Sequence, residues 1–267
     1  MLRLAAGLAA IIGTLVFGHA ALAQPVMSRC LAVANNAARF VPAAYVSTQL
    51  ETGQVRITYE GHSTYLIESP AGVRVATDYN GYAGQGVIPD VVTMNHAHTS
   101  HYTDFPDPRI KHVLRGWKEG SYAEYNLTVN DVFIRNVPTN IRSWAGGTVE
   151  FGNSIFIFEV AGLCIGHLGH LHHELTDQQL HQIGQLDIVM VPVDGTYTLD
   201  HAGMREVLKQ LQARVVLPMH YFSAEGLARF VANLGKDWLS RVNEGPSIVL
   251  SQATMPQAPE MLILPPN

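Results

Sequence analysis

The chain has 267 residues, 47% of them hydrophobic, which is enough to bury a substantial core in one large or two small domains. Its 17 Lys and Arg against 22 Asp and Glu give a formal net charge of −5, with no basic run of the kind that follows a phosphate backbone. This composition argues against a disordered chain, a coiled coil and a nucleic-acid partner.

The first 23 residues have the pattern of a secretory signal peptide. Arg3 supplies the positive start, residues 4–17 form an apolar run, and Ala21 and Ala23 flank Leu22 in a cleavage site of the small-x-small type. We expect cleavage before Gln24 and a periplasmic or secreted mature protein without a membrane segment. An uncleaved membrane anchor is the alternative, which the short, glycine-interrupted run disfavours.

Export permits disulfide bonds, and the chain has two cysteines, Cys30 and Cys164. Their pairing stays open at this stage. Cys164 lies in the apolar run 163–165, where a thiol behaves as a small hydrophobic group, and Cys30 lies in a predicted helix over 28–40. Neither fits the spacing of a cysteine-zinc site, which is therefore excluded.

After the predicted helix over 28–40 and a linker, the chain shows strand patterns. Three runs, 55–59, 63–67 and 73–77, predict an antiparallel meander with a turn at 70–72. Further apolar runs predict buried strands at 90–94, 112–114, 132–134, 155–160, 163–165, 188–193 and 215–218, with a hairpin across Ala161 and Gly162.

Helical patterns interrupt the strands only in the second half, at 176–183, 200–211 and 224–234. Two groups of strands, the second alternating with helices, predict an α/β fold of two sheets with helices on their outer faces. We expect a signal peptide (1–23), an N-terminal helix and linker (24–50), one compact domain (51–255) and a C-terminal tail (256–267).

Histidines gather in two windows. Residues 96–101 hold three and directly follow the predicted strand 90–94, while residues 167–173 hold four and directly follow the strand 163–165. On an extended strand end, positions i and i+2 point the same way, and a turn can return i+5 beside them, so three imidazoles can surround a metal ion. Exposed loop histidines that bind metal adventitiously are the alternative. His62, His112, His181 and His201 are isolated, and we interpret them as structural or surface residues.

Several strings of residues, taken together and in order, resemble the metallo-β-lactamase superfamily. They are 61–67 (Gly-His-Ser-Thr-Tyr-Leu-Ile), 77–78 (Thr-Asp), 90–101, 167–173, 194–198 (Asp-Gly-Thr-Tyr-Thr) and 218–221 (Pro-Met-His-Tyr). Within that superfamily the chain is most similar to the L-ascorbate-6-phosphate-lactonase-like hydrolases. The resemblance covers about residues 55–222 and implies an αββα sandwich with the metal site at one edge of the two sheets.

Three positions depart from the family pattern. Ser100 stands where the His-x-His-x-Asp-His motif has its aspartate, His170 where a later aspartate bridges two ions, and Asn140 where a loop histidine is usual. The last motif histidine, His220, is retained. Without the bridging carboxylate we expect one ion in place of two.

The ligands that the resemblance implies all offer nitrogen: His96, His98, His101, His170 and His220. Such a set suits zinc or another transition metal and disfavours Mg²⁺ or Ca²⁺. Three histidines and a water would form an open zinc site that lowers the pKa of the water. Zinc is therefore the expected cofactor.

Two carboxylates are candidates for supporting roles. Asp104, three residues beyond His101, and Asp78, at a strand end, are the candidate general base and the partner of a ligand imidazole. A loop residue and a strand-end cap are their alternative roles. Asp194 is expected to line the pocket, and Tyr197 and Tyr221 are candidate hydroxyl donors.

Two functions remain open. The first is a metal-dependent hydrolase that acts on an ester, lactone or phosphoester of a small molecule. The second is a non-catalytic exported protein that binds a metal or ligand on the same fold. The retained histidines favour the first, Ser100 and His170 favour the second, and the sequence does not indicate an oligomeric state.

Overall fold

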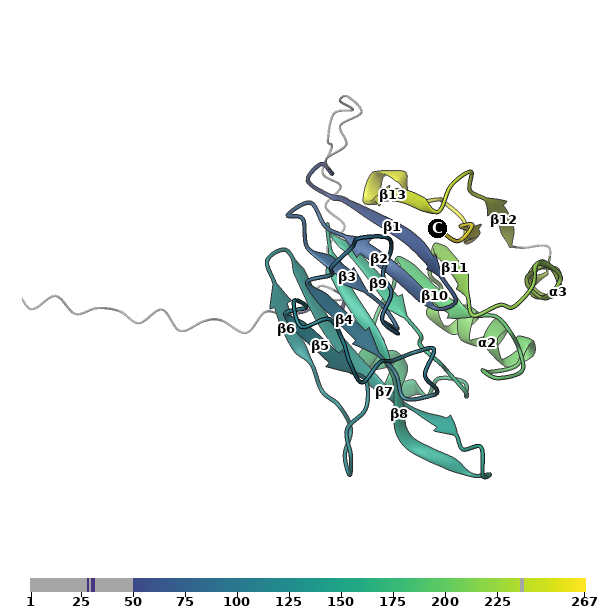
Figure 1. The fold of residues 1–267 in the computed structure, drawn as a ribbon. Helices are drawn as coiled ribbons and strands as arrows, with labels where there is room; N and C mark the ends of the chain where they lie inside the picture. Colours follow the sequence, from purple (N-terminus) through teal and green to yellow (C-terminus); the bar gives the residue numbers. More distant parts are fainter. Residues whose placement is uncertain (1–27, 29, 32–49, 236–237) are drawn as a thin grey trace, which may run out of the picture.

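The computed structural model describes residues 28, 30–31, 50–235 and 238–267 (Figure 1). The predicted signal peptide and nearly all of the predicted 28–40 helix lie outside these residues. Within them, no helix is both long and apolar enough to cross a bilayer.

Two sheets face each other and form the body of the molecule (Figure 1). The first has six strands in the order β13-β1-β2-β3-β4-β5. Their bounds are Ser247–Ser251 (β13), Gln54–Gly61 (β1), Thr64–Glu68 (β2), Arg74–Ala76 (β3), Val91–Met94 (β4) and His112–Arg115 (β5). The predicted meander is confirmed, because β1, β2 and β3 pair antiparallel.

The second sheet has eight strands in the order β12-β14-β11-β10-β9-β8-β7-β6. Their bounds are Leu239–Val242 (β12), Glu260–Ile263 (β14), Val215–Met219 (β11), Ile188–Pro192 (β10), Leu163–His167 (β9), Thr148–Val160 (β8), Val132–Arg142 (β7) and Asn126–Val129 (β6). The predicted hairpin across Ala161 and Gly162 joins β8 to β9.

Side chains alternate between two apolar layers along the central strands of the second sheet. In β10, Ile188 and Met190 face the other sheet, whereas Val189 and Val191 face the helices. All five residues of this strand are buried, because both faces of the sheet are covered.

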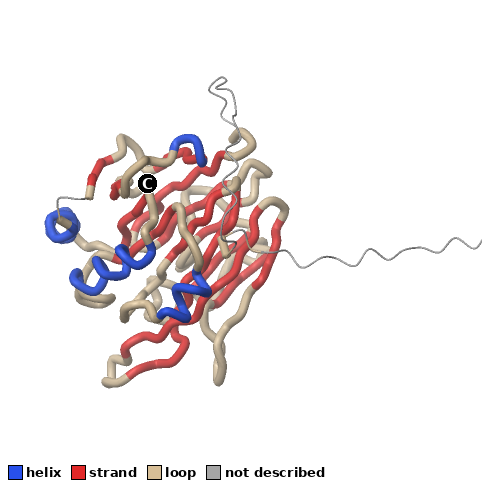
Figure 2. Tube along the Cα trace, turned by 180° about the vertical axis from the view of Figure 1, so that it is seen from behind, coloured by secondary structure: helices blue, strands red, loops and turns tan. Residues whose placement is uncertain are grey.

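The three α-helices of the described chain pack on the outer face of the eight-stranded sheet (Figure 2). They are α1 (Asp177–Ile183), α2 (His201–Leu211) and α3 (Ala224–Leu234), and their N-caps are Thr176, Asp200 and Ser223. In the described chain, loop residues such as Tyr79, Ala83 and Ile110 cover the outer face of the six-stranded sheet. The predicted two-sheet sandwich is confirmed, with helices on one outer face.

Several strands lie where no pattern indicated them: β6, β12, β13 and β14. Residues 256–267, expected as a tail, contain β14, which lies between β11 and β12 and pairs with both. The last residue also attaches to β1, since the Asn267 backbone amide donates to the Tyr59 carbonyl (2.9 Å). Residues 256–267 therefore pack with the two sheets.

The two cysteines form a disulfide, with 5.9 Å between their Cα atoms and 134 positions between them in the sequence. Cys164 lies on β9, and Cys30 is buried on the helical side of the same sheet. The Gln185 amide donates to the Cys30 carbonyl (3.1 Å), and Gly184 leaves no room there for a Cβ atom, which would lie 2.4 Å from that carbonyl oxygen. Cys30 is thus fixed beside the end of α1.

Replacing both cysteines by serine should lower the free energy of unfolding by about 3 kcal/mol, because the long loop is no longer closed in the unfolded chain. Denaturant titration with and without dithiothreitol measures this. The reductant should bring the wild type to the level of the variant and leave the variant unchanged. Equal stabilities without reductant would contradict the prediction.

Candidate metal centre

The carboxyl ends of several strands meet at one edge of the sandwich. β3 and β4 run parallel in one sheet, and β9, β10 and β11 run parallel in the other. The segments that leave these ends carry Asp78, residues 95–101, residues 168–173, Asp194 and His220. Parallel strands release their loops on the same side, and this edge is where such folds place their ligands.

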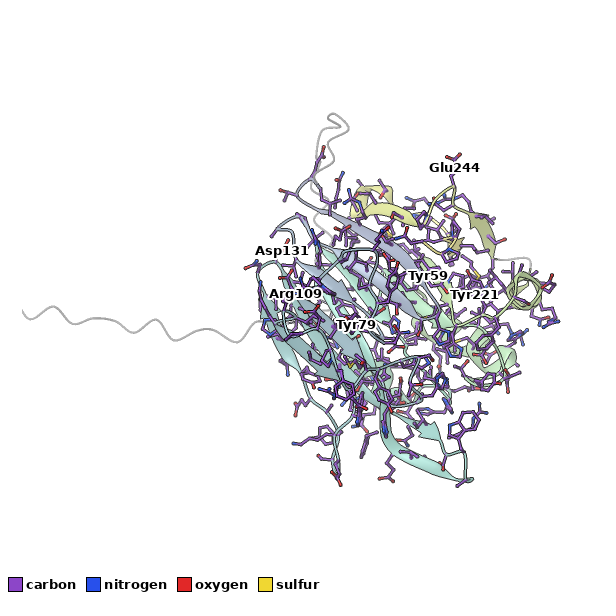
Figure 3. All side chains as sticks on the ribbon, in the orientation of Figure 1. Tyr59, Tyr79, Arg109, Asp131, Tyr221 and Glu244 are labelled. Atoms are coloured by element: carbon purple, nitrogen blue, oxygen red, sulfur yellow. A yellow bond between two sulfur atoms is a disulfide. The ribbon has the colours of Figure 1, made fainter. Side chains whose placement is uncertain are left out.

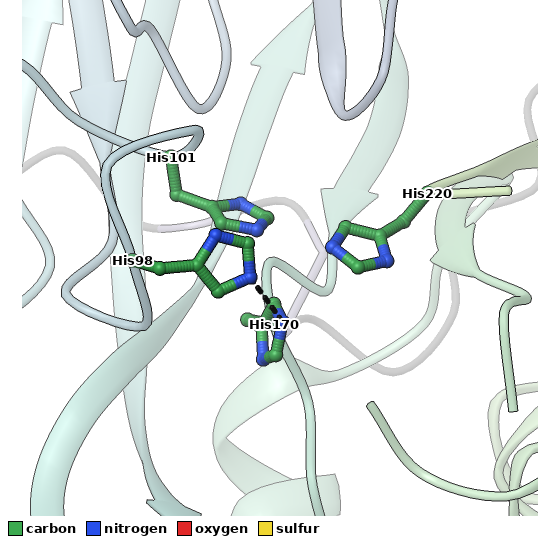
Figure 4. A group of neighbouring side chains, drawn as sticks. All are labelled: His98, His101, His170 and His220. Carbon is green, nitrogen blue, oxygen red and sulfur yellow. Dashed lines mark hydrogen bonds between the residues drawn. The ribbon is translucent and has the colours of Figure 1, made fainter. Parts of the chain in front are cut away.

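Four histidines converge there from both sheets (Figure 4). One ring nitrogen from each of His98, His101, His170 and His220 lies within 4.8 Å of the others. His101, His170 and His220 are buried and His98 is partly exposed, so the group opens to solvent on the His98 side. The structure brings together four of the five histidines predicted from the sequence.

Asp78 holds His101. This fully buried carboxylate contacts Nδ1 of His101 (2.8 Å) through one oxygen and accepts from the Asn95 amide (2.8 Å) through the other. Burial alone would raise the pKa of Asp78, but His101 and then His167 hold it below its ordinary value. An ionised Asp78 keeps the hydrogen of His101 on Nδ1 and leaves Nε2 as the free nitrogen.

Asp194 holds His220 in the same way. Its Oδ1 contacts Nδ1 of His220 (2.9 Å) and the Thr198 hydroxyl (2.5 Å), while Oδ2 accepts from the backbone amides of residues 196–198. Burial opposes ionisation, yet the bonds to His220 and Thr198 keep the pKa of Asp194 far below its ordinary value. Here too Nε2 is left as the free nitrogen.

These two free nitrogens have no partner. Among the described residues, Nε2 of His101 and Nε2 of His220 are buried and form no hydrogen bond. A buried polar atom without a partner is costly, unless a ligand supplies the missing interaction. Two unprotonated imidazole nitrogens that face one point fit a metal ion.

Ser100 supports His98. Its hydroxyl contacts Nδ1 of His98 (2.7 Å) and Nε2 of His62 (2.8 Å), and so joins two rings. Nε2 of His98 then faces Nε2 of His170 at 3.0 Å, the contact drawn in Figure 4. Ser100 therefore fills the place of the missing motif aspartate as a neutral partner of a site imidazole.

His62, interpreted from the sequence as a structural residue, lies beside the group, with its ring centroid 4.4 Å from that of His220. The His220 amide donates to the His62 carbonyl (2.6 Å), and the Tyr59 hydroxyl donates to the same oxygen (2.8 Å). Tyr221 packs against Tyr59 with 6.1 Å between ring centroids, and both residues are labelled in Figure 3. These contacts join the β1–β2 turn to the end of β11.

His96 lies outside the group of four. Its exposed ring stacks on Trp117, with 5.0 Å between centroids. The extended backbone ends at Met94, and the chain then turns so that the His101 amide donates to the His98 carbonyl (2.9 Å). The alternation assumed for positions 96 and 98 no longer applies in a turn, whereas the predicted return of residue 101 does occur.

Asp104 is exposed in the loop after His101 and forms no hydrogen bond or ion pair with the described residues. It does not line the pocket beside the histidines. Of the two predicted carboxylates, Asp78 is the one that contacts a histidine of the group.

Burial favours the neutral form of His62, His98 and His170. Burial first and neighbouring histidines second lower the pKa of His98 to about 4 and that of His62 to about 3. The pKa of His170 is also far below its ordinary value, first through burial and then through His101 and His220. Neutral imidazoles are the form that binds metal ions.

A pocket of about 330 Å³ lies beside His98 and His170. The loop between β7 and β8 forms one wall and residues 196–197 another, and the exposed rings of Trp144 and Tyr197 lie 6.1 Å apart. Arg142 also lines it, but its guanidinium donates to the backbone carbonyls of residues 196–198 and to His172. Sequence patterns indicated neither Arg142 nor Trp144, since both lie outside the strands predicted at 132–134 and 155–160.

The fold and the histidine-lined edge define a metallohydrolase-type α/β sandwich. Residues 56–220 match the family model of the beta-lactamase superfamily domain, so the chain belongs to the metallo-β-lactamase superfamily. The family predicted from the motifs is confirmed.

Relatives agree with this assignment. A metal-dependent hydrolase of Thermoplasma volcanium is 23% identical over 193 residues, which cover 62% of this chain and 83% of that protein. The structure of a candidate zinc-dependent hydrolase of this superfamily from Thermotoga maritima is 29% identical, with a TM-score of 0.58 over 79% of this chain and 98% of the other. A metallo hydrolase of Ignicoccus hospitalis, 21% identical, shares the fold with a TM-score of 0.52 over 74% of this chain and 99% of its own.

The lowered pKa of His62 predicts that the metal-free fold is sensitive to acid. As pH falls below the ordinary value of 6.5, the unfolded chain binds this proton before the folded chain, whose pKa is about 3. The free energy of unfolding is therefore complete above pH 6.5 and declines as pH falls from there toward 3. We expect Tm to fall between about pH 7 and about pH 4.5, and to fall less in His62→Gln.

Thermal unfolding of metal-free protein at several pH values measures this difference. His181→Gln, an exposed change on α1, is the matched control and should follow the wild type. A His62→Gln variant with the same pH dependence as the wild type would contradict the assignment.

Proposed function

We propose that this chain is an exported metal-dependent hydrolase that holds one zinc ion at the histidine group and cleaves small esters or lactones. The observation that carries the proposal is the pair of buried, unpartnered Nε2 atoms on His101 and His220, each opposite an Nδ1 held by a carboxylate. All donors at the centre are nitrogen, which suits zinc. No carboxylate is among the four ligand candidates, which favours one ion over two.

The ion, when bound, would supply a Lewis acid and lower the pKa of a water molecule. The chain supplies orientation: Asp78 holds His101, Asp194 holds His220, and Ser100 holds His98. The Trp144 and Tyr197 rings form the wall against which an apolar part of the substrate would pack. Relatives that are themselves named metal-dependent hydrolases support this activity.

The pocket favours a neutral substrate over a phosphoester. Arg142 is the only Lys or Arg among the described residues that line it, and backbone carbonyls occupy its guanidinium. Phosphate recognition needs free cationic or amide donors. Of the three substrate classes predicted from the sequence, we therefore propose carboxylic esters or lactones that carry an apolar or aromatic group.

Protein purified without chelators should contain about one zinc ion per chain, and His220→Ala should lose it. The protein should hydrolyse an aryl carboxylic ester or a lactone faster than a phosphodiester. Elemental analysis and turnover on both substrates test this. One bound ion without turnover of any substrate would favour a non-catalytic metal-binding protein, and no ion would contradict the proposal.

Trp144→Ala should raise KM for an aryl ester about tenfold and change kcat little, because it removes a binding wall and leaves the histidines in place. Phe105→Ala is the matched control, since Phe105 is 91% exposed and does not line the pocket. Equal KM values in the two variants would contradict the role given to Trp144.

Export is the remaining part of the proposal and rests on the first 23 residues of the sequence. Protein recovered from the periplasm or medium should begin at Gln24. N-terminal mass spectrometry tests this. An intact Met1 on membrane-bound material would show that the segment is an anchor.

A further inference from the structure

We propose that His170 is not a zinc ligand but a hydrogen-bond donor that faces the substrate, and that His172 fixes it in this role. The zinc ligands are then Nε2 of His98, His101 and His220. This inference rests on the proposed function, which supplies the ion. Its own evidence is the order of donors and acceptors in a series of hydrogen bonds that runs from Arg142 through His172 and His170 to His98.

The chain of hydrogen bonds starts at the backbone of β7. The Arg142 amide donates to Nδ1 of His172 (2.8 Å), and the Arg142 side chain donates to the same atom through Nε (3.1 Å). A backbone amide can donate but cannot accept, so Nδ1 of His172 carries no hydrogen. A neutral imidazole has one N–H, and in His172 it is therefore on Nε2.

The neighbouring imidazole is fixed by the same strand. The Asn140 amide donates to Nε2 of His173 (3.2 Å), and Nδ1 of His173 donates to the Glu174 carbonyl (2.7 Å). Asn140 and Arg142 are two positions apart on β7, so their amides point to the same side of the strand. His172 and His173 thus accept hydrogen bonds from two backbone amides of this strand.

Because His172 carries its hydrogen on Nε2, it fixes the donor and the acceptor in each following hydrogen bond of the site. Nε2 of His172 donates to Nδ1 of His170, so the hydrogen of His170 is on Nε2 and points at Nε2 of His98 (3.0 Å). His98 then carries its hydrogen on Nδ1 and donates to the Ser100 hydroxyl (2.7 Å), which donates to Nε2 of His62 (2.8 Å). The opposite direction would leave His172 without any N–H.

His170 therefore differs from its three neighbours. His98, His101 and His220 each direct an N–H away from the centre, to Ser100, Asp78 and Asp194, and an unprotonated Nε2 toward it. His170 directs an N–H toward the centre, where Nε2 of His98 accepts it. An ion bound to Nε2 of His98 would take that lone pair and leave the His170 N–H for the substrate. His98, His101 and His220 would hold the ion as three nitrogen ligands, the number found in catalytic zinc sites, where a water completes the set.

The position of His170 suits a donor to the substrate. It lines the same pocket as Trp144 and Tyr197, on the side where the histidine group opens. An N–H held in place before the reaction stabilises negative charge that develops on a carbonyl oxygen. An ester or lactone oxygen that enters from the pocket would meet this N–H.

His172→Glu should reverse the direction of these hydrogen bonds, because an ionised carboxylate can accept a hydrogen bond but cannot donate one. His170 would then donate from Nδ1 and offer an unprotonated Nε2, as His101 does beside Asp78. X-ray absorption at the zinc edge should count three imidazoles in the wild type and four in His172→Glu, and zinc should bind about tenfold more tightly in the variant. His173→Glu is the matched control and should keep three imidazoles, since His173 does not contact His170.

His170→Ala tests the same point without relying on the glutamate variant. It should keep three imidazoles on zinc and lower turnover, whereas His98→Ala should lose an imidazole. Four imidazoles in the wild type, or a count that falls in His170→Ala, would overturn the inference and leave the proposed hydrolase intact. A zinc-bound protein with three imidazoles and no turnover would instead contradict the hydrolase.

Discussion

An ionised carboxylate can be buried beside an imidazole only when its oxygens find donors, and this requirement shapes the loops at the site. Asp78 is fully buried and adopts a left-handed backbone conformation (φ 43°), which places it between His101 and the Asn95 amide. Asp194 needs a tight loop whose successive amides turn toward one oxygen. The free nitrogens of His101 and His220 face the centre because these two carboxylates occupy the other side of each ring.

Three of the seven non-glycine residues with positive φ in the described chain lie at this site. His62 (φ 51°) and His220 (φ 54°) also adopt the left-handed region, which is uncommon for residues other than glycine and is typically found at functional sites. A hydrogen bond between their backbones holds both conformations together. The two sheets are thus joined at the site by the residues that form it, and movement of one sheet against the other would displace the imidazoles.

The sequence predicted what depends on local periodicity and on strand ends. The buried strands β1, β4 and β10 and the three capped helices follow from their apolar patterns. The two histidine windows follow strands, and the family resemblance added His220 to residues 98, 101 and 170. An exposed edge strand such as β12 has little apolar pattern in its sequence, because all four of its residues face solvent.

The prediction that His96 binds the metal assumed an extended backbone beyond Met94, where β4 in fact ends. The sequence around His62 indicates a turn but not the contact of this ring with His220. The cysteine pair is joined across 134 positions, a distance over which no local pattern carries information.

Arg142 connects the two halves of the site through a single loop. The amides of residues 196–198 point to Asp194, and the carbonyls of the same residues accept from the Arg142 guanidinium. The peptide groups of this loop therefore lie between a negative and a positive side chain, which stabilises their orientation. The Arg142 amide meanwhile fixes the hydrogen of His172. One exposed residue on a long hairpin thus helps to orient both His220, through Asp194, and His170, through His172. This explains why the guanidinium, although it lines the pocket, is not free to bind an anionic substrate.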